Sequence, residues 1–496
     1  MSSIAARLER LPLSGFHRKL LVIGGLGYMF DGLDSSSLAF LLPVVSKLWH
    51  LSSVQSGLVA SSTYMRYFFG AFLSGVLADI IGRRRIMMSA LSIYCVASFA
   101  SGMVNDWHTF FALRILAGFG SGAEAVVIAP FLAEFIPRRY RGMFCGALVG
   151  FMSFGYVTSS ILGYTVIGKF PDGWRYMAVI TSLPVVMLLW WRKTLPESPR
   201  WLEAQGRVRE ALSIVETVEA WFAKQGIALA EPSLSETPLA VPTKPRGALG
   251  NVAAIWSRKL AKTTAVSWLM WFSVAFAYYS FFSWIPSLLV KEGLTITKSF
   301  GYSIAIYGAQ IPGYFTAAWL NEKIGRKRVV ASYMLLGGVA AIALAFSHTA
   351  TQIMAAGICL SFFMNGAFAG VYAYTPEIFP TAVRTTGTGS SSSFGRIGSV
   401  SAPILVGFVY PAAGFLGVFG MTTAVLVAGA CVVLVFGIET RGRSLEEIEA
   451  QELGARTAPS PLSRDAASVA ASEQQAVPAD VPARPPNSFD HANAEG

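Results

Sequence analysis

The stretch Gly75-Val-Leu-Ala-Asp79-Ile-Ile-Gly82-Arg83-Arg84-Arg85 has a degenerate second copy, Ala318-Trp-Leu320-Asn-Glu322-Lys-Ile-Gly325-Arg326-Lys327-Arg328. Gly82 and Gly325 are 243 positions apart, and two other sets of residues keep the same offset. They are Pro43 with Pro286, and Glu134, Pro137 and Arg141 with Glu377, Pro380 and Arg384. One offset at three separate places predicts that the chain consists of two related halves.

The composition indicates a membrane protein. Of 496 residues, 53% are hydrophobic and only 14% are charged, whereas an ordinary soluble domain carries about 25% charged residues. Apolar segments of roughly the 20 residues that cross a bilayer as a helix recur about twelve times, six on each side of a polar stretch. They lie near 20–45, 57–79, 86–104, 109–134, 143–168, 174–192, 263–290, 301–320, 329–346, 353–376, 387–410 and 414–437. The sequence therefore predicts an all-α membrane protein with twelve transmembrane helices in two six-helix halves.

This pattern divides the chain into five parts. We expect an N-terminus (1–19), a first half (20–192), a central loop (193–262), a second half (263–437) and a tail (438–496). The central loop contains an amphipathic part from Trp201 to Trp221 and a part rich in Pro and Ser from Glu231 to Pro245. Beyond about residue 454 the tail is rich in Ala, Pro, Ser and Asp and has no apolar periodicity, so we expect disorder there.

The net charge of +11 could suggest a nucleic-acid partner, but the positions of the basic residues explain it without one. Of 39 Lys and Arg, most lie in the N-terminus, the central loop, the tail and the loops on the same side as these. Five lie in the opposite loops, namely Lys47, Lys169, Arg175, Lys291 and Lys298, and three within helices, namely Arg66, Arg114 and Arg396. Basic loops stay in the cytoplasm, so we expect a multi-pass protein of the inner (plasma) membrane with both termini cytoplasmic and the lipid bilayer as its surroundings.

Histidines and cysteines give no support for an enzyme. The four cysteines are far apart inside apolar runs, and the five histidines sit in tails or near helix ends. Neither a zinc site nor a Ser/His pair is indicated, and we expect no metal and no cofactor. A signalling receptor would need an added cytoplasmic domain, for which the tail is too short and polar.

The two Gly-Arg copies resemble the loop signature of the major facilitator superfamily. Leu195-Pro-Glu197-Ser-Pro-Arg200-Trp-Leu and Glu439-Thr-Arg441-Gly-Arg-Ser-Leu445 resemble motifs of its sugar porters and metabolite–proton symporters. The resemblance implies the major facilitator fold and a gate that latches the cytoplasmic side in one state. The alternative is a solvated basic loop that only sets topology. The implied gate residues are Gly75, Asp79, Gly82, Arg83, Arg84, Glu134, Arg141, Glu197, Arg200, Glu322, Gly325, Arg326, Glu377, Arg384 and Glu439.

Two acids lie about a dozen residues into the first helix, near the middle of the bilayer. Asp31 and Asp34 are three residues apart, so they share a face and would repel each other if both were ionised. This makes the pair a candidate proton acceptor, the alternative being an Asp that only bonds neighbouring helices. Asp31-Gly-Leu-Asp34 resembles the motif of aromatic acid–proton symporters and nicotinate transporters.

The fourth helix contains Arg114-Ile-Leu-Ala-Gly118-Phe-Gly120-Ser-Gly122-Ala-Glu124. The glycines lie inside an apolar helix with no preceding strand, which favours close helix packing over a phosphate loop. The segment is similar to the R-x-x-x-G-x-G motif of proton-coupled members of the superfamily. Arg114 is thereby a candidate for proton coupling, and Glu124 could bind either substrate or protons.

The second half differs at the positions that match the two acids, where Val274 and Ala277 stand. Arg396 lies near mid-depth of the eleventh helix and is a ready partner for a substrate carboxylate, or alternatively for a protein carboxylate. Further candidate polar contacts to substrate are Tyr278, Tyr279, Gln310, Asn365 and Tyr372. The run from Tyr374 to Gly398 resembles organic-acid and nicotinate transporters.

Together these features predict a symporter that moves a small organic acid, such as nicotinate or an aromatic carboxylate, with protons. The proton gradient would drive transport, substrate would bind between the halves, and we expect a monomer. The alternative is a sugar–proton symporter, although sugars need no buried arginine. Arg66 departs from the resembling families, which usually carry a small residue at this position of the second helix.

Overall fold

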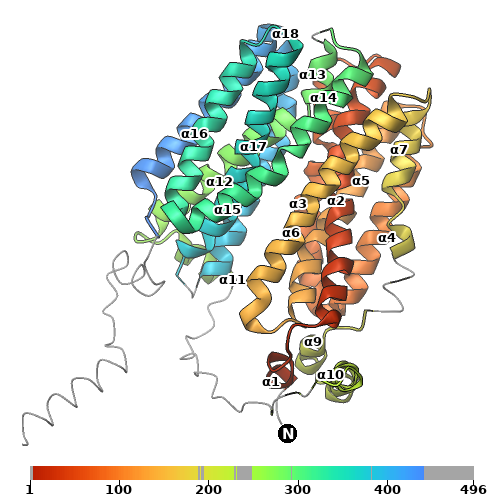
Figure 1. The fold of residues 1–496 in the computed structure, drawn as a ribbon, viewed down its shortest axis with the longest axis vertical. Coiled ribbons are helices and arrows are strands. Elements are labelled where there is room, and N and C mark those ends of the chain that lie inside the picture. The colour runs from red at the N-terminus through yellow and green to blue at the C-terminus, as the bar shows by residue number, and fades with distance from the viewer. Residues whose placement is uncertain are drawn as a thin grey trace, which may run out of the picture. The chain divides into compact units, whose positions relative to one another are not determined.

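The computed structural model describes residues 4–187, 190, 195–227, 229, 231, 248–291, 293–380 and 383–440, which are helices joined by short connections (Figure 1). The expected disorder beyond about residue 454 lies outside the described residues. Six membrane-crossing segments make up the N-terminal half. They are α2 (Gly15–Leu48), α3 (Ser53–Ile81), α4 (Arg83–Ser101), α5 (Trp107–Ala133), α6 (Arg138–Leu162) with the π-helical turn η1 (Gly163–Ile167), and α7 (Gly173–Thr181).

The C-terminal half repeats this arrangement with more interruptions. Its elements are α12 (Ala261–Phe282), α13 (Ile285–Lys291), α14 (Ile296–Gly308), α15 (Gln310–Ile324), α16 (Arg326–Ala345), α17 (Ala350–Tyr374), the 3₁₀ turn η2 (Thr375–Glu377) and α18 (Arg384–Phe436). α12 and α13 form one crossing segment, as do α14 and α15, while α18 contains two that meet at a kink at Gly414. The described residues thus trace the predicted twelve segments in two halves of six.

Five helices of the described residues are long and apolar enough to cross a membrane by length and composition alone. They span Trp107–Ala133, Ala261–Phe282, Arg326–Ala345, Ala350–Glu377 and Thr386–Phe436. Other crossing segments are divided into shorter helices or carry charged residues, as α2 does with Asp31 and Asp34. The criteria of length and hydropathy alone therefore find fewer membrane-crossing segments than the two-half repeat predicts.

The repeat is also visible in backbone geometry. Gly82 ends α3 with a φ of 115°, and Gly325 ends α15 with a φ of 95°. Only glycine adopts such angles without strain, so both sharp turns into the next helix need this residue. We call the end of the bundle with these turns and their arginines the basic end, and the other end the opposite end.

Four helices that begin at the opposite end are capped by side chains. Ser52 and Gln55 form a reciprocal capping box at α3, and Thr349 and Gln352 form another at α17. Asp106 accepts a hydrogen bond from the Thr109 N–H at 2.8 Å at the start of α5, and Thr295 accepts one from Lys298 at α14. Each cap satisfies backbone donors that the first helical turn leaves unpaired.

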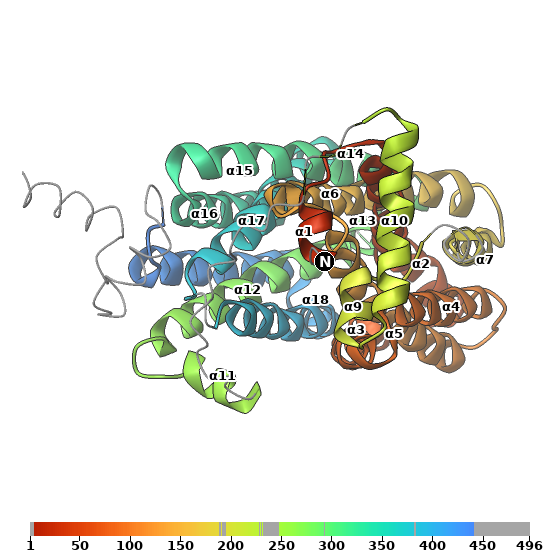
Figure 2. The same ribbon diagram turned by 90° about the horizontal axis from the view of Figure 1, so that it is seen from below.

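Part of the central loop forms a small helical platform at the basic end, together with α1 (Ile4–Glu9). α9 (Pro199–Ala204) and α10 (Val208–Lys224) cover the predicted amphipathic stretch, and α11 (Ala248–Ile255) precedes α12. Figure 2 shows α1, α9 and α10 across the basic end of the N-terminal half. Leu8, Val215 and Phe222 belong to one buried apolar cluster. The sequence reasoning missed α1, because six residues are too few to show helical periodicity.

Two ion pairs fasten α1 to α10. Arg7 donates to Glu219 at 3.0 and 2.5 Å, and Arg10 donates to the same carboxylate at 2.6 Å. Burial alone would raise the pKa of Glu219, but the hydrogen bonds from both arginines outweigh it and lower that pKa. The carboxylate therefore stays charged at neutral pH, and both ion pairs persist there.

Glycines allow the helices of the N-terminal half to approach closely. A Cβ atom at Gly118 of α5 would collide with the carbonyl oxygen of Thr63 of α3, and one at Gly120 would lie 2.6 Å from the Ala90 carbonyl oxygen. This geometry confirms the packing role that the sequence predicts for these glycines.

We expect Gly118→Ala to lower the apparent melting temperature of the purified protein by about 1–3 °C, because over-packing a tight helix contact costs about 1–3 kcal/mol. Gly150→Ala on α6 is the matched control, since a Cβ there meets nothing within 4 Å. Thermal unfolding of both variants in detergent measures the difference, and equal melting temperatures would contradict the packing role of Gly118.

Candidate functional site

A cavity of about 220 Å³ lies between the two halves at mid-depth. The N-terminal half contributes residues of α2, α3, α5 and α6, and the C-terminal half contributes residues of α12, α15, α17 and α18. Aromatic residues are the largest group among the described lining residues, which also include one acid and one base. The aromatic, amide and charged side chains of the wall are Tyr28, Asp31, Tyr64, Tyr156, Trp271, Tyr278, Tyr279, Tyr314, Asn365, Phe368, Tyr372 and Arg396.

The acid and the base come from opposite halves. Asp31 of α2 is 5% exposed; its Oδ1 accepts a hydrogen bond from the Ser121 hydroxyl, and its Oδ2 is buried without a hydrogen-bond partner. Arg396 of α18 is half-buried and interacts with the hydroxyl of Tyr279. It also acts electrostatically on Asp31. Among the described lining residues, an anion that enters the cavity thus meets one cation, Arg396, which also acts electrostatically on Asp31.

Behind Asp31, the N-terminal half buries a pair of opposite charges. Arg114 of α5 donates to Asp34 of α2 at 2.9 Å, and both side chains are fully buried. The Ser98 hydroxyl lies 3.4 Å from the other oxygen of Asp34. Glu124 of α5 is 4% exposed, and its Oε1 has no hydrogen-bond partner. The two predicted aspartates therefore have different surroundings, since Asp31 faces the cavity and Asp34 faces Arg114.

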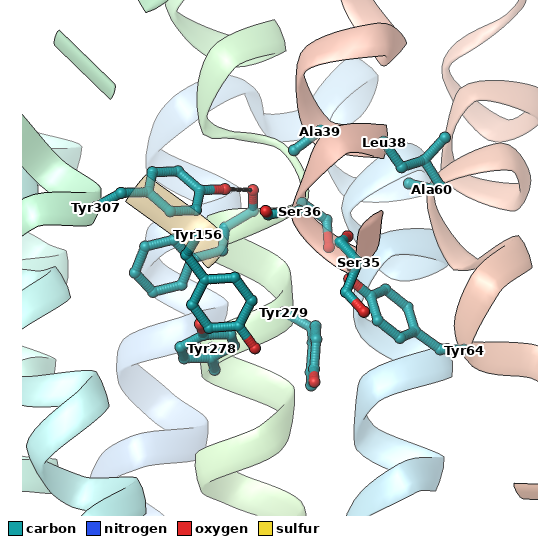
Figure 3. A pocket seen from close by; sticks show the side chains of 12 residues that line it. Ser35, Ser36, Leu38, Ala39, Ala60, Tyr64, Tyr156, Tyr278, Tyr279 and Tyr307 are labelled. Carbon is teal, nitrogen blue, oxygen red and sulfur yellow. Dashed lines mark hydrogen bonds between the residues drawn. The ribbon is translucent and has the colours of Figure 1, made fainter. Parts of the chain in front are cut away.

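A layer of tyrosines lines a smaller pocket that adjoins the cavity toward the opposite end (Figure 3). Tyr64 lies against Tyr279 with ring centroids 4.4 Å apart, and Tyr156 lies 6.3 Å from Tyr278 and 6.4 Å from Tyr307. Each of these contacts joins the N-terminal half to the C-terminal half. The layer is aromatic and carries hydroxyl groups, so it can contact both the face and the edge of a planar ligand.

The halves also meet beyond this layer, toward the opposite end. The Ser61 hydroxyl donates to the Val400 carbonyl at 2.9 Å, and Lys291 donates to Ser53 at 3.2 Å. Phe40 packs against Phe300 with ring centroids 5.2 Å apart. Toward the basic end the cavity wall includes Tyr372, which is 44% exposed. Beyond the cavity, these described contacts between the halves thus lie toward the opposite end.

Five of the six predicted substrate contacts line this cavity. They are Arg396, Tyr278, Tyr279, Asn365 and Tyr372. Gln310 is fully buried behind the wall, where its side-chain carbonyl accepts from the Tyr278 hydroxyl at 3.1 Å. Its backbone carbonyl accepts from Asn365 at 2.7 Å. Gln310 thus orients two lining side chains.

The predicted gate residues form one matching ion pair in each half at the basic end. Arg83 pairs with Glu134, and Arg326 pairs with Glu377 at 3.1 Å. Each member of the second pair is 243 positions after its counterpart. The two halves that the sequence relates by this offset therefore also share an Arg–Glu ion pair at equivalent positions.

Other gate residues make contacts around these pairs. Ser198 donates to Glu134, Glu197 accepts from the Arg84 N–H at 3.0 Å, and Arg200 pairs with Glu9 at 3.0 Å. Glu322 pairs with Arg326 at 2.7 Å, Glu439 lies 3.8 Å from Arg328, and Arg384 donates to the Phe379 carbonyl at 3.4 Å. The side chains of Gly75, Asp79, Arg141 and Arg66 lie outside the described part of the structure.

Comparison with known proteins identifies the family. The family described as "Sugar (and other) transporter" matches residues 23–451. The chain belongs to this transporter family of the major facilitator superfamily. It is accordingly a multi-pass membrane transporter of a small molecule and not an enzyme.

Individual relatives agree with this assignment over nearly their full lengths. The chain is 36% identical to the "Niacin transporter NiaP" of Acinetobacter baylyi, over 90% of this chain and 99% of that protein. It is 33% identical to the "Putative niacin/nicotinamide transporter NiaP" of Bacillus subtilis, over 88% of this chain and all of that protein. The xylose transporter XylE from E. coli, in a partially occluded inward open conformation, has the same fold, with a TM-score of 0.68 at 17% identity over 87% of this chain and 100% of that one.

Several aromatic residues of this transporter's cavity were missed by the sequence reasoning. The cavity is lined by Tyr28, Tyr64, Tyr156, Trp271 and Tyr314. Their positions in apolar helices give no signal of their own, because the direction of a ring depends on helix rotation. A tyrosine in a segment that also holds a mid-depth charge is the signal that could have found Tyr28.

We expect Arg114→Met to destabilise the protein strongly, since removing one partner of a buried ion pair costs about 3–5 kcal/mol. The double variant Arg114→Met, Asp34→Asn should recover part of this loss, because it leaves no charge unpaired at that position. Thermal unfolding measures the cycle, with the exposed Arg258→Met as control. A wild-type melting temperature for Arg114→Met would contradict the importance of the pair.

Proposed function

We propose that this transporter is a proton-coupled symporter for nicotinate or a closely similar aromatic carboxylate. The single observation that carries the proposal is an arginine, Arg396, in a cavity walled by tyrosines. A guanidinium offers paired donors to a carboxylate, and aromatic walls suit a flat ring. The names of the two relatives, a niacin transporter and a putative niacin/nicotinamide transporter, support the same substrate class.

The proposed binding mode uses both halves. The carboxylate of the substrate pairs with Arg396, and the ring lies among Tyr278, Tyr279 and Tyr156. Asn365 and Tyr372 supply further polar contacts, and Gln310 acts indirectly by holding Tyr278 and Asn365 in position. Release of the substrate requires the halves to separate at one end.

Alternating access is part of the proposal. The described contacts between the halves lie at mid-depth or toward the opposite end, and these contacts support a state that opens toward the basic end. The bias of Lys and Arg toward the basic end supports a cytoplasmic location for it, in the bacterial inner membrane. Rocking of the halves would break these contacts and close the basic end, where the pairs Arg83–Glu134 and Arg326–Glu377 belong to the gate. We propose that a monomer suffices, because the cavity lies within one chain.

The buried acids of the N-terminal half are the proposed proton carriers. Intramembrane carboxylates are costly when charged and unpaired, so they exchange protons as their surroundings change. Asp34 has Arg114 as a counter-ion, whereas Asp31 and Glu124 each have an oxygen without a hydrogen-bond partner. The proton gradient would then drive uptake without a cofactor.

The test is uptake of labelled nicotinate into proteoliposomes, measured in two ways. Asp31→Asn should abolish accumulation driven by a pH gradient, because an amide cannot titrate. Counterflow between equal substrate pools should survive in this variant, since exchange needs no net proton movement. Asp172→Asn, an exposed position, is the matched control.

Arg396→Gln should instead impair both assays. A charged hydrogen bond contributes about 1.5–3 kcal/mol, so affinity should fall by about one to two orders of magnitude. Arg258→Gln controls for loss of an exposed arginine. If Arg396→Gln binds nicotinate as tightly as the wild type, the carboxylate is not held by Arg396, and a neutral substrate such as a sugar becomes the better candidate. Normal accumulation by Asp31→Asn would move the proton site elsewhere, with Glu124 next.

A further inference from the structure

Asp31 and Arg396 face the same cavity from opposite halves. Asp31 Oδ2 is buried and has no hydrogen-bond partner, while Oδ1 accepts only a neutral hydroxyl. Arg396 interacts with a neutral phenol, that of Tyr279, and its positive field reaches Asp31. The guanidinium is therefore a cation that favours a charged Asp31.

We infer that the substrate carboxylate takes the place of Asp31 as counter-ion of Arg396, and that Asp31 then binds a proton. This inference rests on the proposed function and adds the link between its two ligands. An anion next to Arg396 cancels the positive field at Asp31 and adds a negative one, and both changes favour the protonated acid. Substrate binding and proton binding therefore strengthen each other, and thermodynamic linkage makes the effect reciprocal.

The other described charged or titratable groups around Asp31 are less suited to bind the proton when a carboxylate pairs with Arg396. Asp34, one turn along α2, is paired with Arg114 behind the cavity wall. Glu124 of α5 acts on Asp31 but is not among the residues that line the cavity. The phenols of Tyr156, Tyr279 and Tyr64 ordinarily titrate near pH 10 and stay neutral in the range considered. Arg66 of α3 has its side chain outside the described part of the structure.

The exchange of counter-ions fixes how many protons are taken up with the ligand and how Kd depends on pH. Above about pH 6 a free carboxylate ligand is ionised, since such groups titrate near pH 4. Its binding to the wild-type protein should then take up about one proton, and the apparent Kd should rise by up to about tenfold per pH unit where Asp31 is charged. Asp31→Asn should bind nicotinate without proton uptake and with a Kd that does not depend on pH.

The experiment is calorimetric titration of the purified full-length protein with nicotinate at pH 7, in buffers of different ionisation enthalpy, which counts the protons taken up. We expect about one proton for the wild type and for Asp172→Asn, and none for Asp31→Asn. Asp31→Glu keeps a titratable carboxyl and should retain the uptake, which guards against a folding defect in the amide variant.

Three results would overturn the proposal. The first is nicotinate binding to the wild type without proton uptake, which would leave the substrate assignment standing. The second is full proton uptake by Asp31→Asn, most clearly if Asp34→Asn or Glu124→Gln abolishes it instead. The third is absence of nicotinate binding to the wild type, which would overturn the proposed function as well.

Discussion

Among the described residues of the N-terminal half, three carboxylates and one arginine are buried within the helices of a protein that belongs in a bilayer. This imbalance is the constraint on which the rest of the structure depends. Arg114 can neutralise one acid, and it is paired with Asp34. Asp31 and Glu124 are buried beside this pair, each with an oxygen that has no hydrogen-bond partner. Charged groups in such surroundings must be paired or protonated. The buried acids of this half can therefore exchange protons, and a cation across the cavity changes the balance between their charged and protonated forms.

The two halves share a fold but divide the chemistry. At the basic end the repeat is symmetric, since Gly82 and Gly325 make the same turn and the pairs Arg83–Glu134 and Arg326–Glu377 correspond. At mid-depth the two halves carry different residues at equivalent positions. The N-terminal half holds the acids, whereas the C-terminal half has Val274 and Ala277 at the matching positions and presents Arg396 instead. A symmetric frame with an asymmetric centre allows one half to bind protons and the other to bind an anion.

Sequence reasoning reached the fold and the charged part of the site because these features have local signals. Gly-Arg turns recur at a fixed offset, apolar segments have a membrane-spanning length, and Asp31, Asp34, Arg114 and Arg396 stand out at membrane depth. The division of roles between Asp31 and Asp34 could not be predicted, because both lie on one helix face and only the packing of α5 separates them. The position of Gln310 behind the wall has a similar reason, since it depends on the rotation of α15 after the break at Ala309. Tyr64 and Tyr156 can be assigned to the site only when the packing of the two halves against each other is known.

The most direct test of the proposed anion site is a structure of the full-length protein with nicotinate bound. We expect the carboxylate within about 2.7–2.9 Å of the Arg396 guanidinium nitrogens. The ring should lie against Tyr278 and Tyr279, and the guanidinium should have turned away from Asp31. Nicotinate bound outside this cavity, or bound in it with its carboxylate facing away from Arg396, would contradict the central claim.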